Sequence, residues 1–374
     1  MLELSRRLTL IGSGGRIRPA QALSSSPRVS VVIPCYNYGH YLRQCVRSVT
    51  KAQPGIELEV IIVDDASADD SVEVAHALQA EDPRIKVIRH THNRGHIETF
   101  NEGLWAATGD YILLLSADDL VTPGALTRAA ALLQAEPTVG MVYGNALHFV
   151  SKIPSSRTSG STWIVWKGVD WLQARCRSGY NVVSSPEVMM RASVLRAIGG
   201  YRADLPHAGD FEMWMRTSAV ADVGYLVGVD QAYYRQHALN MHKKMFDIGS
   251  ARGQLTDMRQ RWQSFEAVFS GAARELPERS RLLQTARQTL ARHALDYANY
   301  AFARGVREFP LDEFELFAEE MQIDAERSSA GRALSRRKKL GMLPLPLHPL
   351  WAPSAIAWRL AEELRRWRRW QIGI

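Results

Sequence analysis

Two stretches of sequence decide the fold class: VSVVIPCYNYGHYL at Val29–Leu42 and EVIIVDDASADDS at Glu59–Ser71. Each begins with a continuous apolar run of strand length and ends in polar residues that lead into a helical pattern. Strands that are buried on both faces have this composition, because helices cover both sides of a parallel sheet. The two stretches therefore predict strand–turn–helix units of an α/β fold.

The same alternation continues along the chain to about residue 143. Strands are predicted at Val29–Pro34, Glu59–Val63, Ile85–Arg89, Tyr111–Leu115 and Val139–Tyr143, and helices at about 40–51, 70–81, 97–107 and 123–135. Pro123 suits the first turn of the last helix. The polar segment SKIPSSRTSGSTW at Ser151–Trp163 is typical of a loop. Together these patterns predict a mostly parallel sheet flanked by helices.

The later part of the chain has a different pattern. From about residue 253 to 323 the periodicity is helical throughout, which predicts a C-terminal helical extension. A basic linker follows from Ser328, then the Pro-rich LPLPLHPLWAP and a short helix. We therefore expect a basic N-terminal tail at 1–28, an α/β domain at 29–245, a helical appendage at 246–327 and a basic C-terminal segment at 328–374.

Composition restricts the class of protein. The chain has 374 residues, of which 46% are hydrophobic and 23% charged, so it is a globular protein and not a disordered or fibrous one. Its three cysteines favour reduced thiols in a cytoplasm over a disulfide framework. No apolar run approaches the ~18 residues of a spanning helix, and no signal peptide is expected at the start.

The net charge of +7 is unevenly distributed. Residues 331–374 hold ten Lys/Arg and two Glu, a net of +8, and residues 1–28 hold five Arg and one Glu, a net of +4. Residues 29–330 therefore carry 31 basic and 36 acidic residues, a net of −5. An acidic body without a recognisable nucleic-acid module disfavours nucleic acid as the partner.

The basic C-terminal segment contains AIAWRLAEELRRWRRWQI at Ala355–Ile372. Apolar residues at helical spacing form one narrow stripe, and arginines and tryptophans surround it. This pattern is typical of a helix that lies on an anionic membrane surface. An ordinary amphipathic helix that docks on the protein by its stripe explains the pattern equally well.

Polar side chains follow three of the predicted strands. Tyr36 and Asn37 come after the first strand, Asp64 and Asp65 after the second, and a pair of aspartates after the fourth, within SADDL at Ser116–Leu120. Ligands of open α/β sheets bind beyond the carboxyl ends of the strands. An oxygen-rich site suits Mg²⁺ or Mn²⁺ that carries phosphate groups. The three strand ends therefore predict a nucleotide site.

At this point the sequence resembles family 2 glycosyltransferases, nucleotide-sugar-dependent enzymes with the GT-A fold. The resemblance covers about residues 29–240, and its motifs follow the family's order. They are VVIPCYN, VDDASADDS, NRG (Asn93–Gly95), FNEGLWAATGDYI (Phe100–Ile112), SADD, RASVLRAIGGY (Arg191–Tyr201), GDFEMWMR (Gly209–Arg216) and YYRQH (Tyr233–His237). Two positions depart from the pattern: Ser116 replaces the first Asp of D-x-D, and Gly209 replaces the Glu before the catalytic Asp.

The resemblance implies a set of site residues. Asp210 matches the catalytic base, although capping of the helix that starts there is the structural alternative. The implied metal ligands are Asp118, Asp119 and His237, for Mn²⁺ or Mg²⁺. The implied nucleotide-sugar contacts are Pro34, Tyr36, Asn37, Asp65, Arg94, Asn101, Asp118 and Arg235.

The implied activity is inverting transfer of a hexosyl group from a nucleotide sugar, with a UDP-sugar favoured. The acceptor would be a hydroxyl of a glycan or lipid-linked saccharide, in cell-surface polysaccharide synthesis at the cytoplasmic face of the membrane. Two alternatives remain: a nucleotidyltransferase, and a non-catalytic sugar-nucleotide-binding relative, which the two departures suggest. His90, His92 and His96 lack the spacing of a zinc site and are expected to be exposed loop residues.

Overall fold

The computed structural model describes residues 14–241, 250–303, 306, 309–321, 324–340 and 352–374. The chain divides into two compact units. The first unit runs to Leu172 and also includes Asn181–His237 and Trp370–Ile374. The second unit comprises Gln173–Tyr180 and Ala238–Arg369.

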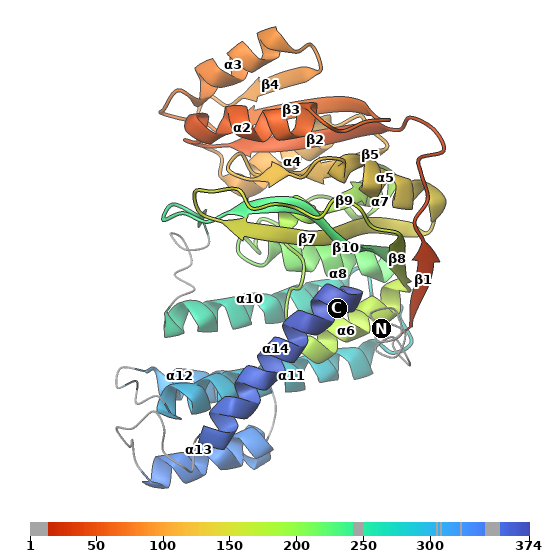
Figure 1. Ribbon diagram of the computed structural model, residues 1–374. Helices are drawn as coiled ribbons and strands as arrows, with labels where there is room; N and C mark the ends of the chain where they lie inside the picture. The colour runs from red at the N-terminus through yellow and green to blue at the C-terminus, as the bar shows by residue number, and fades with distance from the viewer. Residues whose placement is uncertain (1–13, 242–249, 304–305, 307–308, 322–323, 341–351) are drawn as a thin grey trace. The chain divides into compact units, whose positions relative to one another are not determined.

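The first unit is built on a mixed sheet (Figure 1). Its strands within the described residues are β1 (Gly15–Pro19), β2 (Arg28–Cys35), β3 (Glu57–Asp64), β4 (Ile85–Arg89), β5 (Tyr111–Leu114), β6 (Leu120–Val121), β7 (Val139–Phe149), β8 (Thr162–Trp166), β9 (Met189–Arg191) and β10 (Asp222–Arg235). Their order is β1-β8-β10-β7-β9-β5-β2-β3-β4, and β6 pairs with β10. The helices that accompany them are α2 (Gly39–Thr50), α3 (Ser71–Glu81), α4 (His96–Ala106), α5 (Ala125–Ala135), α6 (Gly168–Ser178), the 3₁₀ helix η1 (Ser185–Glu187), α7 (Ala192–Ile198) and α8 (Gly209–Val220).

The strands predicted at the start of the chain are confirmed. β2 pairs in parallel with β3 and β5, and β3 pairs in parallel with β4. Helices cover both faces of β2: Val31 and Ile33 belong to the core cluster that includes Leu42 of α2, and Val32 faces α4. A Cβ on Gly103 of α4 would stand 2.3 Å from Cγ1 of Val32, so glycine permits this close packing of helix on strand.

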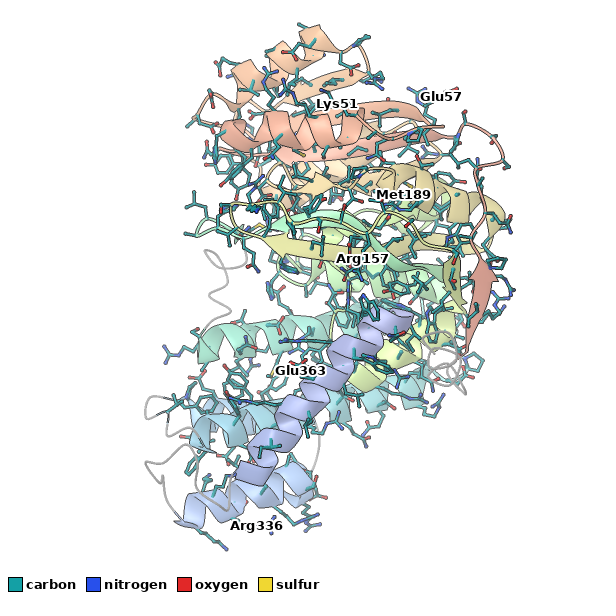
Figure 2. The ribbon with its side chains drawn as sticks, viewed as in Figure 1. Lys51, Glu57, Arg157, Met189, Arg336 and Glu363 are labelled. Atoms are coloured by element: carbon teal, nitrogen blue, oxygen red, sulfur yellow. The ribbon has the colours of Figure 1, made fainter. Side chains whose placement is uncertain are left out.

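Beyond β5 antiparallel strands join the sheet, so the sheet as a whole is mixed. The short strand β9 lies antiparallel between β5 and β7, and its Met189 is fully buried (Figure 2). β8 begins at Thr162, inside the segment expected to be a loop, and pairs antiparallel with β1. Residues 15–19 of the expected N-terminal tail are thus part of the sheet, while residues 1–13 lie outside the described residues.

Strand β10 has the most partners. It pairs in parallel with β7, antiparallel with β8, and antiparallel with the two residues of β6. The last pairing joins Tyr233 to Leu120. It therefore brings the end of β10 beside the segment Ser116–Asp119.

The second unit is helical, as expected for a C-terminal extension. Its described helices are α10 (Ala251–Ser270), α11 (Arg279–Ala303), α12 (Leu311–Met321), η2 (Ala325–Arg327), α13 (Ser329–Leu340) and α14 (Ala352–Ile372). α13 occupies the expected basic linker, and its Leu334 and Arg337 are buried. The Pro-rich segment lies almost entirely at 341–351, outside the described residues. No helix of the described chain is both long and apolar enough to cross a membrane.

Candidate active site

The polar residues predicted at the strand ends gather at one edge of the sheet. Cys35 at the end of β2 lies beside Asp64 at the end of β3, and Val32 of β2 lies beside Leu114 of β5. The loops that follow these strands carry the predicted residues. The parallel register thus places them together, as expected from the carboxyl ends of parallel strands.

Asp118 and His237 form the centre of this edge. Nε2 of His237 lies 2.9 Å from Oδ2 of Asp118, although the two residues are 119 positions apart. Both side chains are largely shielded from solvent. The pairing of β6 with β10 explains the contact, because it sets the loop before β6 against the residues after β10.

Asp119 has a different environment from Asp118. Its Oδ1 accepts a hydrogen bond of 2.8 Å from the backbone N–H of Arg235, and its side chain is buried. Burial raises the pKa of Asp119 well above its usual range, and the nearby charge of Asp118 raises it further. Asp119 therefore ties the loop to β10, and only part of its carboxylate is available for a metal ion.

The guanidinium of Arg235 lies beside the Asp118–Asp119 loop. It is buried, it donates to the carbonyl of Asp118 at 2.8 Å and to Oε1 of Gln44 at 2.7 Å, and it lies 4.4 Å from the ring centre of Tyr41 and 4.6 Å from that of Phe149. These contacts tie the Asp118 loop to the end of β10.

The donor set at this edge fits a hard divalent cation. Mg²⁺ and similar ions are commonly held by one or two carboxylates together with substrate phosphate oxygens. Asp118 supplies a carboxylate and His237 an imidazole. Among the described residues no three His, Cys, Asp or Glu side chains cluster as a complete metal site. The arrangement is thus suited to a metal ion that arrives with phosphate oxygens, and not to an ion caged by protein alone.

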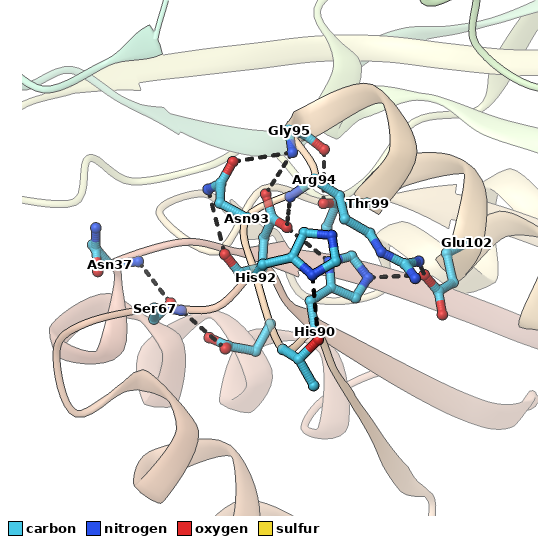
Figure 3. A network of polar contacts seen from close by, with 12 residues as sticks. Asn37, Ser67, His90, His92, Asn93, Arg94, Gly95, Thr99 and Glu102 are labelled. Atoms are coloured by element: carbon cyan, nitrogen blue, oxygen red, sulfur yellow. Dashed lines mark hydrogen bonds and ion pairs between the residues drawn. The ribbon is translucent and has the colours of Figure 1, made fainter.

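Asp65 contacts His90, Arg94 and Gly95, which Figure 3 labels within a network of polar contacts. Its two oxygens accept hydrogen bonds from the backbone N–H groups of Arg94 at 2.7 Å and Gly95 at 3.0 Å, and Oδ1 also lies 2.7 Å from Nδ1 of His90. The other ring nitrogen of His90 lies 2.8 Å from Glu102. Burial alone would raise the pKa of Asp65, but these hydrogen bonds lower it below its usual value.

The network gives these residues contacts that the sequence did not predict. The carboxylate of Asp65 holds the Asn93–Gly95 loop. The guanidinium of Arg94 lies 2.8 Å from Glu102. His90 is buried, not exposed, because it bridges two carboxylates. This role of His90 could hardly be predicted, because no residue next to it in the sequence points to either of its two carboxylate partners.

The loop after β2 keeps an open aromatic side chain beside this network. Tyr36 is 49% exposed, so its ring is available for stacking. Asn37 has a left-handed backbone with φ of 58°, its N–H donates to Oγ of Ser67 at 2.9 Å, and its Oδ1 accepts from the N–H of Ala68 at 2.8 Å. Pro34 pairs with Val63 inside the sheet and fixes the start of the loop.

Asp210 lies in the first turn of α8 without capping it. The N-cap residue is Ala208, and no side chain caps this helix. Oγ of Ser185 donates to Oδ2 of Asp210, and the hydroxyl of Tyr201 bonds the same carboxylate. Burial raises the pKa of Asp210 above its usual value, while these hydrogen bonds and the nearby His96 and His207 limit the rise. A half-buried carboxylate with a raised pKa is a suitable general base.

Asn101 supports this base and was expected to line the nucleotide. Its Nδ2 donates to the carbonyl of Tyr201 at 2.9 Å, and its Oδ1 accepts from the N–H of Tyr201 at 2.7 Å. The side chain therefore fixes the backbone of Tyr201. Gly209 fits the same arrangement, because a Cβ there would stand 3.2 Å from Cδ1 of the Tyr201 ring. This contact gives a physical reason for glycine where the family pattern has Glu.

Sequence reasoning missed four residues of the site: Tyr38, Ser185, Tyr201 and Tyr234. The ring of Tyr38 lies edge-on to that of His237, with centroids 5.6 Å apart. Tyr234 is half-buried, and its pKa is raised first by burial and then by the charges of Asp119, Asp118 and Asp210. The motif YYRQH contains both Tyr233 and Tyr234. Only the folded structure shows which of the two tyrosines lies near the candidate site.

Residues 30–198 match the family model described as glycosyl transferase family 2. The glycosyltransferase GlyG of Streptococcus pneumoniae is 34% identical over 124 residues, which is 33% of this chain and only 40% of GlyG. An uncharacterized glycosyltransferase of Haemophilus influenzae is 27% identical over 225 residues, 58% of this chain and 67% of that relative.

A solved structure with a similar fold is the mannosyltransferase PcManGT of Pyrobaculum calidifontis, in complex with GDP-Man and Mn²⁺. It aligns with a TM-score of 0.52 and 18% identity over 99% of this chain and 91% of its own. This likeness shows the GT-A fold. Residues 30–198, somewhat less than half of the chain, therefore form a glycosyltransferase family 2 domain.

Proposed function

We propose that the protein is an inverting glycosyltransferase that moves a hexosyl group from a nucleoside-diphosphate sugar to a hydroxyl of a glycan or lipid-linked saccharide. The observations that carry this proposal are the environment of Asp210, a carboxylate with a raised pKa that Ser185 and Tyr201 hold, and the contact of His237 with Asp118 at the strand ends. A base and a phosphate-binding centre in one site suit direct displacement at an anomeric carbon.

Asp210 would act on the acceptor. Its carboxylate accepts the proton of the acceptor hydroxyl while that oxygen attacks the anomeric carbon from the face opposite the departing nucleoside diphosphate. The configuration inverts in one displacement, and no covalent sugar–enzyme intermediate is needed. General-base assistance of this kind contributes about 10²–10⁴-fold to the rate.

Asp118 and His237 are the proposed ligands of a divalent metal ion, with Asp119 holding their loop and offering its second oxygen. When bound, Mn²⁺ or Mg²⁺ would neutralise negative charge that develops on the leaving diphosphate. Support comes from the donor set and from PcManGT, which carries GDP-Man and Mn²⁺ together. Tyr36 and Asn37 are proposed to contact the base of the nucleotide, for which a UDP-sugar remains the favoured donor, with Pro34 fixing their loop.

Cell-surface polysaccharide synthesis at the cytoplasmic face of the membrane is the proposed setting. Relatives named as glycosyltransferases of bacteria support the enzyme class, including a chondroitin synthase of Pasteurella multocida that is 26% identical over 54% of this chain. That match covers only 20% of the synthase, so its acceptor is not carried over.

The test is release of nucleoside diphosphate from a panel of nucleotide sugars with Mn²⁺ and saccharide acceptors. Asp210→Asn should retain the fold and donor binding, because the amide oxygen can accept the same hydrogen bonds, but lose about 10²-fold or more in kcat. Asp204→Asn is the matched control, since Asp204 is an exposed aspartate that pairs with Arg202. Near-normal transfer by Asp210→Asn would refute the base assignment. Pyrophosphate release when a nucleoside triphosphate and a sugar phosphate replace the nucleotide sugar would indicate a nucleotidyltransferase, and donor binding without turnover would indicate a non-catalytic relative.

A further inference from the structure

The helix α14 carries an apolar stripe that is not used for packing. Its members recur at intervals of four, four and three residues, which places them on one face of the helix. Ile356 is 57% exposed, Leu360 65%, Leu364 62% and Trp367 40%. An amphipathic helix that docks on its own protein buries this face. Here the face is open to solvent.

The packing contacts of α14 come from its other side. The guanidinium of Arg365 lies 4.8 Å from the ring centre of Tyr180, within the second unit. The end of the helix belongs to the first unit, where Nε1 of Trp166 donates to the carbonyl of Ile372 at 3.2 Å. The ring of Trp370 is covered by the guanidinium of Arg157, which is 5.6 Å from it (Figure 2). The helix is therefore held without its apolar stripe, so the docked-helix alternative does not account for that stripe.

Cations border the stripe on both sides. On a helical projection Arg359 and Arg366 lie along one border and Arg368 along the other, and all three are exposed. Glu363 of the same helix lies near this border and is 3.6 Å from Arg366 (Figure 2). Residues 356–370 contain five Arg and two Glu, a net charge of +3, whereas residues 29–330 carry a net of −5. The positive charge is thus concentrated where the apolar surface is exposed.

We propose that this face of α14 binds the surface of an anionic lipid bilayer, with the apolar stripe in the headgroup–acyl boundary and the arginines at the lipid phosphates. A narrow stripe with basic borders and an interfacial tryptophan matches that boundary. A second copy of the chain matches it poorly, because its own arginines would meet the same borders. The inference goes beyond the proposed reaction and does not depend on turnover.

The experiment measures flotation of the full-length protein with two kinds of vesicle. One contains phosphatidylcholine alone, and the other also contains about 30–40% phosphatidylglycerol, which makes its surface anionic. Binding should require the anionic lipid and weaken between about 0.1 and 0.5 M salt, because salt screens exposed charges. The double variant Leu360→Gln/Leu364→Gln should bind about tenfold or more weakly. Leu316→Gln on α12 is the matched control, since Leu316 is 53% exposed and lies on another helix.

The outcomes separate the possible occupants. Loss of binding in the double variant, with retention in the control and an unchanged circular dichroism spectrum, supports the proposal. Absence of vesicle binding by the wild-type protein, or binding that the double variant retains, overturns it. Sedimentation without vesicles tests whether a second copy of the chain binds the stripe instead. A dimer that forms with the wild-type protein and is abolished in the double variant would assign the stripe to that second copy. Nucleoside-diphosphate release with a soluble acceptor is independent of each of these results.

Discussion

Replacing Ser185 by alanine should slow glycosyl transfer at neutral pH and shift the acidic limb of the pH–rate profile to higher pH. Ser185 donates a hydrogen bond to the carboxylate of Asp210, and that bond favours the ionised form. Removing the bond leaves burial to act with less opposition, so the pKa of Asp210 rises further above its usual value. A smaller fraction of the enzyme then has an ionised base at pH 7.

The size of the effect follows from the kind of bond that is lost. A hydrogen bond to a charged group contributes about 1.5–3 kcal/mol, and about 1.4 kcal/mol corresponds to tenfold in rate. Tyr201 keeps its own bond to the carboxylate, so we expect the lower end: the acidic limb should move up by about one pH unit, which is a loss of about tenfold in kcat at pH values on that limb. The loss should shrink as the pH rises, because the base becomes ionised in the variant as well.

The assay is release of nucleoside diphosphate at saturating donor from pH 5.5 to 9.5, with donor affinity measured on the same preparation. Ser185→Thr, which keeps the hydroxyl, should restore most of the rate. A merely structural defect would lower the rate equally at every pH and would also weaken donor binding. If Ser185→Ala keeps the wild-type rate and pH profile, the positioning role of Ser185 is wrong.

Two further predictions concern the metal centre and the fold. Asp118→Asn and His237→Gln should each abolish the increase in melting temperature that UDP and Mn²⁺ together produce. In the wild-type protein this increase should be about 5 °C at a ligand concentration near 100 times Kd, and Asp204→Asn should retain it. If both variants retained the increase, the assignment of Asp118 and His237 as metal ligands would be wrong. Glu59 is buried, and although burial alone would raise its pKa, hydrogen bonds from Lys86, Ser30 and Thr108 lower that pKa from 4.5 to about 2. Its stabilisation is therefore complete above pH 4.5 and is lost as the pH falls toward 2. Glu59→Gln should cost about 2 kcal/mol in urea unfolding at pH 7 and progressively less below pH 4.5, and an equal cost at both pH values would contradict this account.

The sequence was sufficient for the part of the fold that local pattern determines. β2 to β5 are apolar runs bounded by turn residues, so their existence, order and parallel pairing could be predicted. β1 and β9 are short and lack a distinctive pattern. They form strands because β8, β5 and β7 offer them hydrogen-bonding edges, and that information is absent from the local sequence.

The candidate site shows the same division. Motif and strand position were enough to bring Asp118 and His237 together and to single out Asp210. They could not show that Arg235 is enclosed by Tyr41 and Phe149, because these three side chains come from distant segments. Ser185 likewise has no motif of its own. Its role depends on the position of η1 beside α8, which only the folded chain defines.

Strand β10 has a consequence for how the protein folds. It is the strand furthest along the chain, yet it lies between β7 and β8, and it pairs with the two residues that follow Asp118 and Asp119. Contacts between segments so distant in sequence form slowly, because a long loop must close before they stabilise the chain. A chain that has assembled only β2 to β5 would have no partner for Asp118. If Asp118 and His237 hold a metal ion as proposed, ligand binding arises only after insertion of β10 and becomes a measure of completed folding.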